Sequence, residues 1–199
     1  MGAGASARYA VVLAASTGGP RTLVSIASKL PSPLAAAVLI VQHMPRAFAR
    51  SLAERLAAAC PLPVRIAEDG EPILASHGYL APGGRHLLVE GEGPETGRIA
   101  LLDSPNGAGV RPSADLAMAS ASEVFGARTI GVVLSGMGRD GAEGALAIKS
   151  RGGRVIAEAP DSAAIPWMPR AVIATGAVDA VMPAGDIPGA IVRMLGRIR

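Results

Sequence analysis

Short apolar runs alternate with helix-type segments along most of the chain. The runs are too short for helices and are bounded by glycine, proline or polar residues, which predicts buried strands at residues 9–14, 35–41, 129–135 and 154–158. Helices are expected between and after them, at residues 20–29, 46–59, 112–124, 141–151, 168–175 and 186–197, with a short strand at 178–182. This alternation predicts an α/β fold with a doubly wound, mostly parallel sheet and helices on both faces.

The stretch from residue 62 to residue 102 has a different character. Short runs of β-type residues, separated by turn-forming clusters, occur at 64–66, 78–80, 86–89 and 98–102. We therefore expect a small antiparallel or mixed insertion of the hairpin type. The length of 199 residues suits one domain rather than two. We predict a disordered leader over residues 1–8 and a single domain over residues 9–199.

Composition excludes several classes of protein. No apolar run approaches the roughly 20 residues that a membrane helix needs, and no charged-then-apolar signal segment opens the chain. The net charge of +3 and the aromatic content of 3% predict no nucleic-acid partner, because binding would need a denser basic patch and stacking side chains. The single cysteine, Cys60, excludes an internal disulfide and predicts a cytoplasmic protein.

Three polar residues follow predicted strands directly or within a short loop. Ser16 follows the first strand, His43 follows the second, and Asp140 lies in the glycine-rich loop after the third. Because the carboxyl ends of parallel strands meet at one edge of a sheet, these side chains should converge there. Together they are a nucleophile, a base and an orienting acid. At a sheet edge we expect the Asp140 carboxylate to be partly solvated.

The turn around Ser16 has two interpretations. Gly18, Gly19 and Pro20 break the strand and open a helix, so Ser16 or Thr17 could simply cap that helix. Alternatively, the turn presents the Ser16 hydroxyl beside backbone amides, which suits a nucleophile whose oxyanion needs donors. The expected convergence of the three strand ends favours the second interpretation.

Other candidate residues are assigned structural roles. His77 and His86 lie among glycine and proline residues and are expected to be turn residues or partners of backbone carbonyls. Asp103 precedes a turn sequence, and Asp115 lies in a helix that Ser113 is expected to cap. The histidines have no zinc-ligand spacing with a cysteine or a second acid, so we predict no metal site.

A rival hypothesis concerns the loop at residues 136–141. Its letters, GMGRDG, match the dinucleotide fingerprint, and the loop follows a strand and opens a helix. The next strand ends in Glu158, close to where a ribose-binding acid would lie. Against this, the fingerprint normally follows the first strand of a domain. A nucleotide-binding module is therefore an alternative hypothesis, less favoured than the serine hydrolase.

Three ordered motifs carry a family resemblance: STGG at residues 16–19, QHMP at 42–45 and GMGRDG at 136–141. Lesser motifs occur at 67–71, 79–83, 111–115 and 168–170. With these motifs the chain resembles, over nearly its whole length, the catalytic domain of the chemotaxis protein-glutamate methylesterases, the CheB type. The resemblance independently implies a doubly wound α/β sheet.

The resemblance also implies a function. It implies a serine hydrolase that removes methyl esters from glutamate side chains of chemoreceptors and releases methanol, and some members also deamidate receptor glutamines. Ser16, His43 and Asp140 match the family's catalytic residues, the backbone of Met137 matches an oxyanion donor, and Thr17 lies beside the nucleophile. The implied partners are the methylated cytoplasmic helices of methyl-accepting chemoreceptors or a related protein substrate. No cofactor is implied.

Two departures from the family pattern stand out. The family usually has histidine before the Arg-Pro-Ser stretch, where this chain has Val110. Members also commonly carry an N-terminal receiver domain, whereas only residues 1–8 precede the first strand of this sequence. We expect no receiver domain within this chain, which is then either an excised catalytic domain or a single-domain relative. A protein-interaction domain that keeps the fold without the activity is a third hypothesis.

Overall fold

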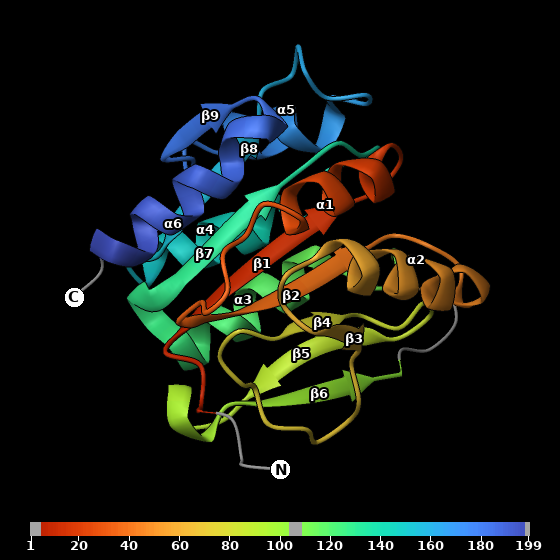
Figure 1. Cartoon of the computed structure of the whole chain (residues 1–199). Helices are drawn as coiled ribbons and strands as arrows, with labels where there is room; N and C mark the ends of the chain where they lie inside the picture. The colour runs from red at the N-terminus through yellow and green to blue at the C-terminus, as the bar shows by residue number, and fades with distance from the viewer. Residues whose placement is uncertain (1–4, 104–108, 198–199) are drawn as a thin grey trace.

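The computed structural model describes residues 5–103 and 109–197 and shows a central sheet between two layers of helices (Figure 1). Seven strands form this sheet in the spatial order β3-β4-β2-β1-β7-β8-β9, and all neighbouring pairs are parallel. The strands are β1 (Tyr9–Ala15), β2 (Ala36–Gln42), β3 (Val64–Ile66), β4 (Gly78–Leu80), β7 (Thr129–Val133), β8 (Arg154–Glu158) and β9 (Ala180–Met182). The predicted doubly wound sheet is confirmed.

Helices cover both faces of the sheet. They are α1 (Gly19–Ala27), α2 (Arg46–Ala59), α3 (Ala114–Phe125), α4 (Ala142–Ser150), α5 (Trp167–Ala174) and α6 (Ile187–Arg197). Short 3₁₀ turns occur at η1 (Pro94–Thr96), η2 (Gly126–Arg128) and η3 (Ala184–Asp186). In Figure 1, α1, α2 and α6 lie on the near side of the sheet, and α3 and α4 lie behind it.

The alternating side chains of β1 show why the sheet needs both layers. Ala10, Val12 and Ala14 pack in the cluster that includes α3, α4 and α5. Val11 and Leu13 point the other way, into the cluster that includes α1, α2 and α6. Since all five side chains are fully buried, β1 reads as a continuous apolar run, as expected for a central parallel strand.

The predicted insertion at residues 62–102 is only partly correct. β5 (His86–Glu90) and β6 (Arg98–Leu102) form an antiparallel hairpin that packs on α3, where the Val89 amide donates to Ser120 Oγ at 3.1 Å. However, β3 and β4 join the main sheet as parallel edge strands. Strands of three residues show no clear periodicity, so only their tertiary partners decide which sheet they join.

The first described residues run along the loop before β4. The Ala7 amide donates to the Ile73 carbonyl at 3.0 Å, and the Ala75 amide donates to the Ala5 carbonyl at 2.9 Å. Residues 5–8 belong to the predicted leader of residues 1–8 and make these backbone contacts. Residues 1–4 lie outside the described part of the chain. In the described residues, no helix is both long and apolar enough to cross a membrane.

Candidate active site

The strand ends bring two of the predicted polar residues side by side. β1 and β2 pair in parallel as far as Ala15 and Gln42, so Ser16 and His43 leave the sheet at the same level. The His43 amide donates to the Ala15 carbonyl at 3.0 Å, and the Ser16 amide donates to the Ser135 carbonyl at 2.9 Å. Backbone hydrogen bonds of adjacent strands thus fix where both side chains start.

His43 and Asp140 are in direct contact. Nε2 of His43 lies 2.7 Å from Oδ2 of Asp140, and their side chains are 7% and 9% exposed. The carboxylate also accepts from Ala114 N at 2.6 Å, Asp115 N at 2.9 Å and Ser113 Oγ at 3.1 Å. Asp140 is therefore an acceptor at the amino end of α3, where helix amides lack partners.

These contacts control the ionisation of Asp140. Burial by itself would raise the pKa of its carboxyl group, but the hydrogen bonds from His43, Ala114 and Asp115 outweigh it and lower the pKa to about 2. The expectation that a sheet-edge crevice leaves this carboxylate partly solvated is wrong, because α3 closes over it. Asp140 therefore holds a buried negative charge beside the His43 ring.

Ser16 lies on the turn between β1 and α1, close to the 136–141 loop. The residue that caps α1 is Gly18, in the left-handed region at φ 85°, and no side chain caps this helix. Since the cap interpretation of Ser16 and Thr17 needs such a bond, it is wrong. A Cβ on Gly136 would lie 2.7 Å from the Cβ of Ser16, so only glycine lets the 136–141 loop approach the serine this closely.

The 136–141 loop is anchored at its start. The Gly136 amide donates to the Ile165 carbonyl at 2.9 Å, and the Met168 amide donates to the Gly136 carbonyl at 3.0 Å. Met137 follows with its side chain 58% exposed. Thr17 follows Ser16 in the turn and is exposed, and its carbonyl accepts from Ser135 Oγ at 2.8 Å. Of the two residues expected to support an oxyanion, Thr17 is thus next to Ser16, and Met137 follows the glycine that approaches it.

Sequence reasoning missed the role of Gln42. Its side chain is 2% exposed, and Nε2 donates to the carbonyls of Ser16 at 2.8 Å and His43 at 3.0 Å. One amide group therefore clamps together the two residues that follow β1 and β2. The available signal was a polar residue that ends an otherwise apolar strand, since such a residue needs partners when it is buried.

A cavity of about 350 Å³ opens over these residues. Ser16, Thr17, Gln42 and His43 line it. Helix α2 contributes Phe48, Ser51, Leu52 and Arg55, and the remaining lining comes from Gly18, Pro20 and Met44. The cavity is large enough to admit a side chain that carries an ester.

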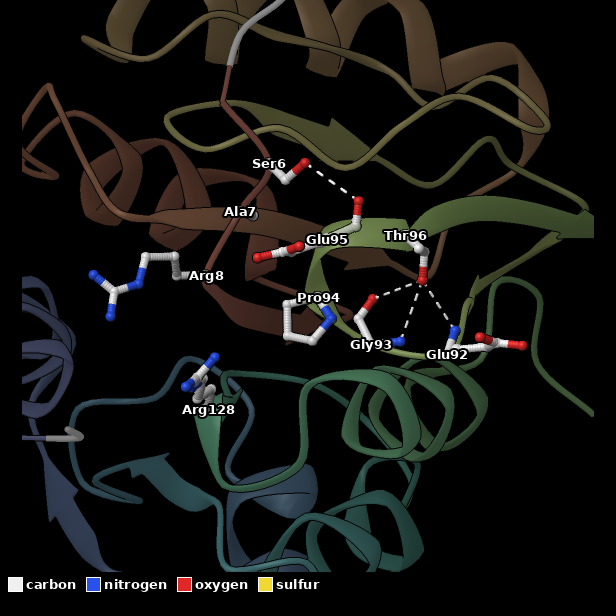
Figure 2. Close-up of a pocket in the computed structure, with 9 residues that line it drawn as sticks. All are labelled: Ser6, Ala7, Arg8, Glu92, Gly93, Pro94, Glu95, Thr96 and Arg128. Atoms are coloured by element: carbon white, nitrogen blue, oxygen red, sulfur yellow. Dashed lines mark hydrogen bonds between the residues drawn. The ribbon is translucent and has the colours of Figure 1, made fainter.

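A larger hollow, of about 810 Å³, lies at the other end of the strands, where β1 and β7 begin (Figure 2). Arg8 and Arg128, which precede β1 and β7, line it together with η1. Its hydroxyls are engaged locally, since Ser6 Oγ donates to the Glu95 carbonyl at 3.3 Å and Thr96 Oγ1 donates to the Gly93 carbonyl at 3.2 Å. Its lining contains no histidine to activate a nucleophile, so the smaller cavity remains the candidate active site.

Comparison with known proteins agrees with this geometry. The family model described as CheB methylesterase matches residues 11–191. The chain belongs to the CheB methylesterase family. A crystal structure of the Thermotoga maritima CheB methylesterase catalytic domain is 39% identical and superposes with a TM-score of 0.89, covering 97% of this chain and 100% of that one.

Curated relatives of the family are longer than this chain. Proteins named protein-glutamate methylesterase/protein-glutamine glutaminase are 47% identical over 193 residues in Pyrococcus abyssi and 44% identical over 189 residues in Symbiobacterium thermophilum. These matches cover 97% and 95% of this chain but 52% and 51% of the relatives. The chain thus spans about half the length of the curated CheB-type proteins that it matches.

The two other histidines, His77 and His86, make different contacts. His77 Nδ1 contacts the Ala75 carbonyl at 2.8 Å, as expected for a turn histidine. For His86 the expectation is wrong: it is 3% exposed in β5, and Nδ1 accepts from the Ser113 amide at 3.1 Å. Burial lowers the pKa of His86, and nearby Arg111 acts in the same direction. His86 is thus a neutral acceptor beside the residues that surround Asp140.

The other residues that the sequence singled out are found in structural or surface positions. Asp103 forms an ion pair with Arg85 at 2.9 Å, and its side chain is exposed. Ser113 caps α3, as predicted, by accepting from the Leu116 amide. Val110, at the position of the family's usual histidine, is 48% exposed. In the described part of the chain, no group of three or more histidine, cysteine or acidic side chains could hold a metal ion.

The nucleotide-binding alternative fails on the contacts of its own loop. A dinucleotide would place its pyrophosphate on free amides at the start of α4. Asp115 Oδ1 already accepts from Gly141 N at 2.8 Å and Gly144 N at 2.7 Å. Glu158 is 1% exposed and accepts from the Ser135 amide at 2.7 Å, which removes the expected ribose ligand from the surface. The 136–141 loop therefore holds protein carboxylates rather than a phosphate site.

Proposed function

We propose that this chain is a serine esterase that hydrolyses methyl esters of glutamate side chains in chemoreceptors or a related protein. Ser16 is the nucleophile, His43 is the general base, and Asp140 orients His43. The observation that carries the proposal is the 2.7 Å contact between His43 Nε2 and the buried Asp140 carboxylate, beside Ser16 at one sheet edge. The relatives' shared name, protein-glutamate methylesterase, supports the choice of ester.

The contact with Asp140 supports the assignment of Nδ1 of His43 as the base. A carboxylate can only accept hydrogen bonds, so Nε2 of His43 carries the proton and Nδ1 is left unprotonated. Nδ1 then takes the hydroxyl proton as Ser16 Oγ attacks the ester carbonyl carbon. The hydrogen bond from Oγ to Nδ1 that this step needs often tightens only when the substrate is bound.

The negative charge that develops on the carbonyl oxygen needs donors. We propose that the Met137 amide, at the start of the anchored 136–141 loop, supplies one, with Thr17 beside the nucleophile. Preorganised amides of this kind typically contribute 10²–10³-fold to turnover. The tetrahedral intermediate collapses as Nδ1–H of His43 protonates the departing methoxide, which leaves as methanol. The glutamyl group is then esterified to Ser16.

Water completes the cycle. His43 removes a proton from a water molecule that attacks the acyl-enzyme, then returns that proton to Ser16 Oγ as the free glutamate leaves. The buried Asp140 charge stabilises the imidazolium in both halves of the reaction. The same sequence applied to a glutamine side chain releases ammonia. The relatives' second name, protein-glutamine glutaminase, supports that deamidation as a second activity of the same site.

Exposed apolar side chains around the cavity support a protein substrate. Phe48 in α2, Met137 in the 136–141 loop and Trp167 at the start of α5 are 62%, 58% and 60% exposed. Phe48 lines the cavity, and Trp167 follows Pro166, which bridges to Gly136. Large exposed apolar groups near a site are typical of surfaces that contact another protein. We propose that they contact the substrate helix on either side of the ester.

Methanol release from a methylated chemoreceptor fragment tests the proposal. Wild-type protein should release methanol, and Ser16→Ala should retain less than a few per cent of that rate with an unchanged circular dichroism spectrum. The matched control is Ser25→Ala, an exposed serine on the neighbouring helix α1, which should match the wild type. Turnover by Ser16→Ala at the wild-type rate would remove Ser16 from the mechanism.

A further inference from the structure

The first amides of α3 and α4 each donate to a carboxylate at the amino end of the other helix. Asp140, two residues before α4, accepts from the first amides of α3, those of Ala114 and Asp115. In return, Asp115 of α3 accepts from the amides of Gly141 and Gly144 at the start of α4. The first amides of a helix have no partner within it, and a carboxylate there is stabilised by the helix dipole. Each helix therefore caps the other.

Asp115 holds one end of the segment that contains the proposed catalytic groups. Both amides donate to a single oxygen, Oδ1, at 2.8 and 2.7 Å. Burial raises the pKa of Asp115, and the hydrogen bond from the Gly144 amide opposes that effect. The other end of the segment is fixed at Gly136 by its bonds to Ile165 and Met168. Met137 and Asp140 lie between these two anchors.

We propose that Asp115 is a positioning residue for the esterase reaction: by holding Gly141 and Gly144, it sets where the Met137 amide and the Asp140 carboxylate lie relative to Ser16. This rests on the proposed function. The hydrogen bonds of Asp115 join it to Asp140, Gly141 and Gly144, so it acts on the reaction through the 136–141 loop. A displacement of about 1 Å at a catalytic group can cost about 10²-fold in turnover, and a lost anchor permits a shift of that size.

Three variants separate geometry from charge. Asp115→Ala removes the acceptor, and kcat should fall between 10- and 100-fold with KM changed less than about twofold. Asp115→Asn keeps an oxygen for both amides and should restore kcat to within about fivefold of the wild type. Asp115→Glu keeps the charge but moves it by one methylene, and should behave like the alanine variant. Glu123→Ala, at an exposed residue of α3 paired with Arg151 away from the loop, is the control.

Hydrogen exchange gives a readout that does not depend on activity. The amides of Gly141 and Gly144 should exchange faster in Asp115→Ala and Asp115→Glu than in the wild type, but not in Asp115→Asn. If wild-type protein releases no methanol while this exchange pattern holds, the proposed function fails and the cap stands.

Several outcomes would overturn the positioning role. Normal kcat in the alanine variant, or equal kcat in the asparagine and glutamate variants, would contradict it. The same holds if each loss of kcat matches the unfolded fraction measured by circular dichroism, because Asp115 would then only stabilise the fold. Should the alanine variant not fold, the comparison of asparagine with glutamate decides the question.

Discussion

Asp140→Asn separates the charge of the buried carboxylate from its shape. In the wild type, Oδ1 accepts from Ser113 Oγ and Asp115 N, and Oδ2 accepts from His43 Nε2 and Ala114 N. Asparagine fits best with its oxygen at the Oδ2 position, because the Ser113 hydroxyl can turn to accept from the new NH₂ group whereas a backbone amide cannot. His43 then keeps its tautomer and loses only the facing charge.

The size of the loss follows from that geometry. Two unit charges roughly 4 Å apart interact by about 4 kcal/mol at an effective dielectric constant of 20. The imidazolium that forms in the transition state loses this stabilisation, which corresponds to about 10³-fold in kcat. Serine proteases lose about 10⁴-fold on the equivalent change, where the histidine also takes the wrong tautomer. We therefore expect about 10³-fold for Asp140→Asn, with KM nearly unchanged.

The assay is single-turnover methanol release at saturating substrate, with thermal unfolding measured in parallel. The new NH₂ group faces the Asp115 amide, so we also expect a stability loss of about 1–3 kcal/mol, typical of an unsatisfied buried polar group. Asp161→Asn, at an exposed aspartate outside the site, is the control. A loss in kcat below about tenfold would refute the argument that the Asp140 charge faces the imidazolium during the reaction.

Two further predictions concern packing and pH. Gly136→Ala should abolish methanol release and lower the unfolding midpoint, because its Cβ would lie 2.7 Å from Ser16 Cβ and overpacking of this kind costs about 1–3 kcal/mol; normal activity would mean that the loop can move away. The pKa of Asp140 is about 2, against 3.8 for the unperturbed group, so its ionised form stabilises the fold. This contribution, about 2 kcal/mol, is complete above the unfolded pKa and is lost as the pH falls towards 2. Urea unfolding from pH 5 to pH 2 should show a weaker pH dependence in Asp140→Asn than in the wild type.

The sequence alone predicted the centre of the fold well. β1 and β2 are continuous apolar runs bounded by glycine, proline or polar residues, and a strand buried on both faces has no other pattern. The position of the site followed from the same pattern, because Ser16 and His43 leave neighbouring parallel strands at the same edge. Asp140 was predicted to join them because its loop follows another strand, and its contact with His43 agrees with that prediction.

The pairing of the edge strands β3 and β4 was less predictable from the sequence. β3 and β4 are three residues each, so their hydrophobic pattern is too short to distinguish a hairpin from a parallel edge. Their backbone partners settle the question, since β4 pairs with β2 and β3 pairs with β4. The predicted strand runs at residues 86–89 and 98–102 correspond to β5 and β6, and their antiparallel pairing is the part of the expected insertion that the structure confirms.

The sequence by itself determined the strands, the helices and which residue types gather at one sheet edge. Only the tertiary structure decided how those residues are held: Gln42 clamps the backbone of Ser16, and Asp115 holds the amide of Gly141 across 26 residues of sequence. Apolar periodicity is a local property of the chain and can be read along it. A hydrogen bond depends on distances of about 3 Å between groups that folding brings together, so its partners appear only when helices and strands pack.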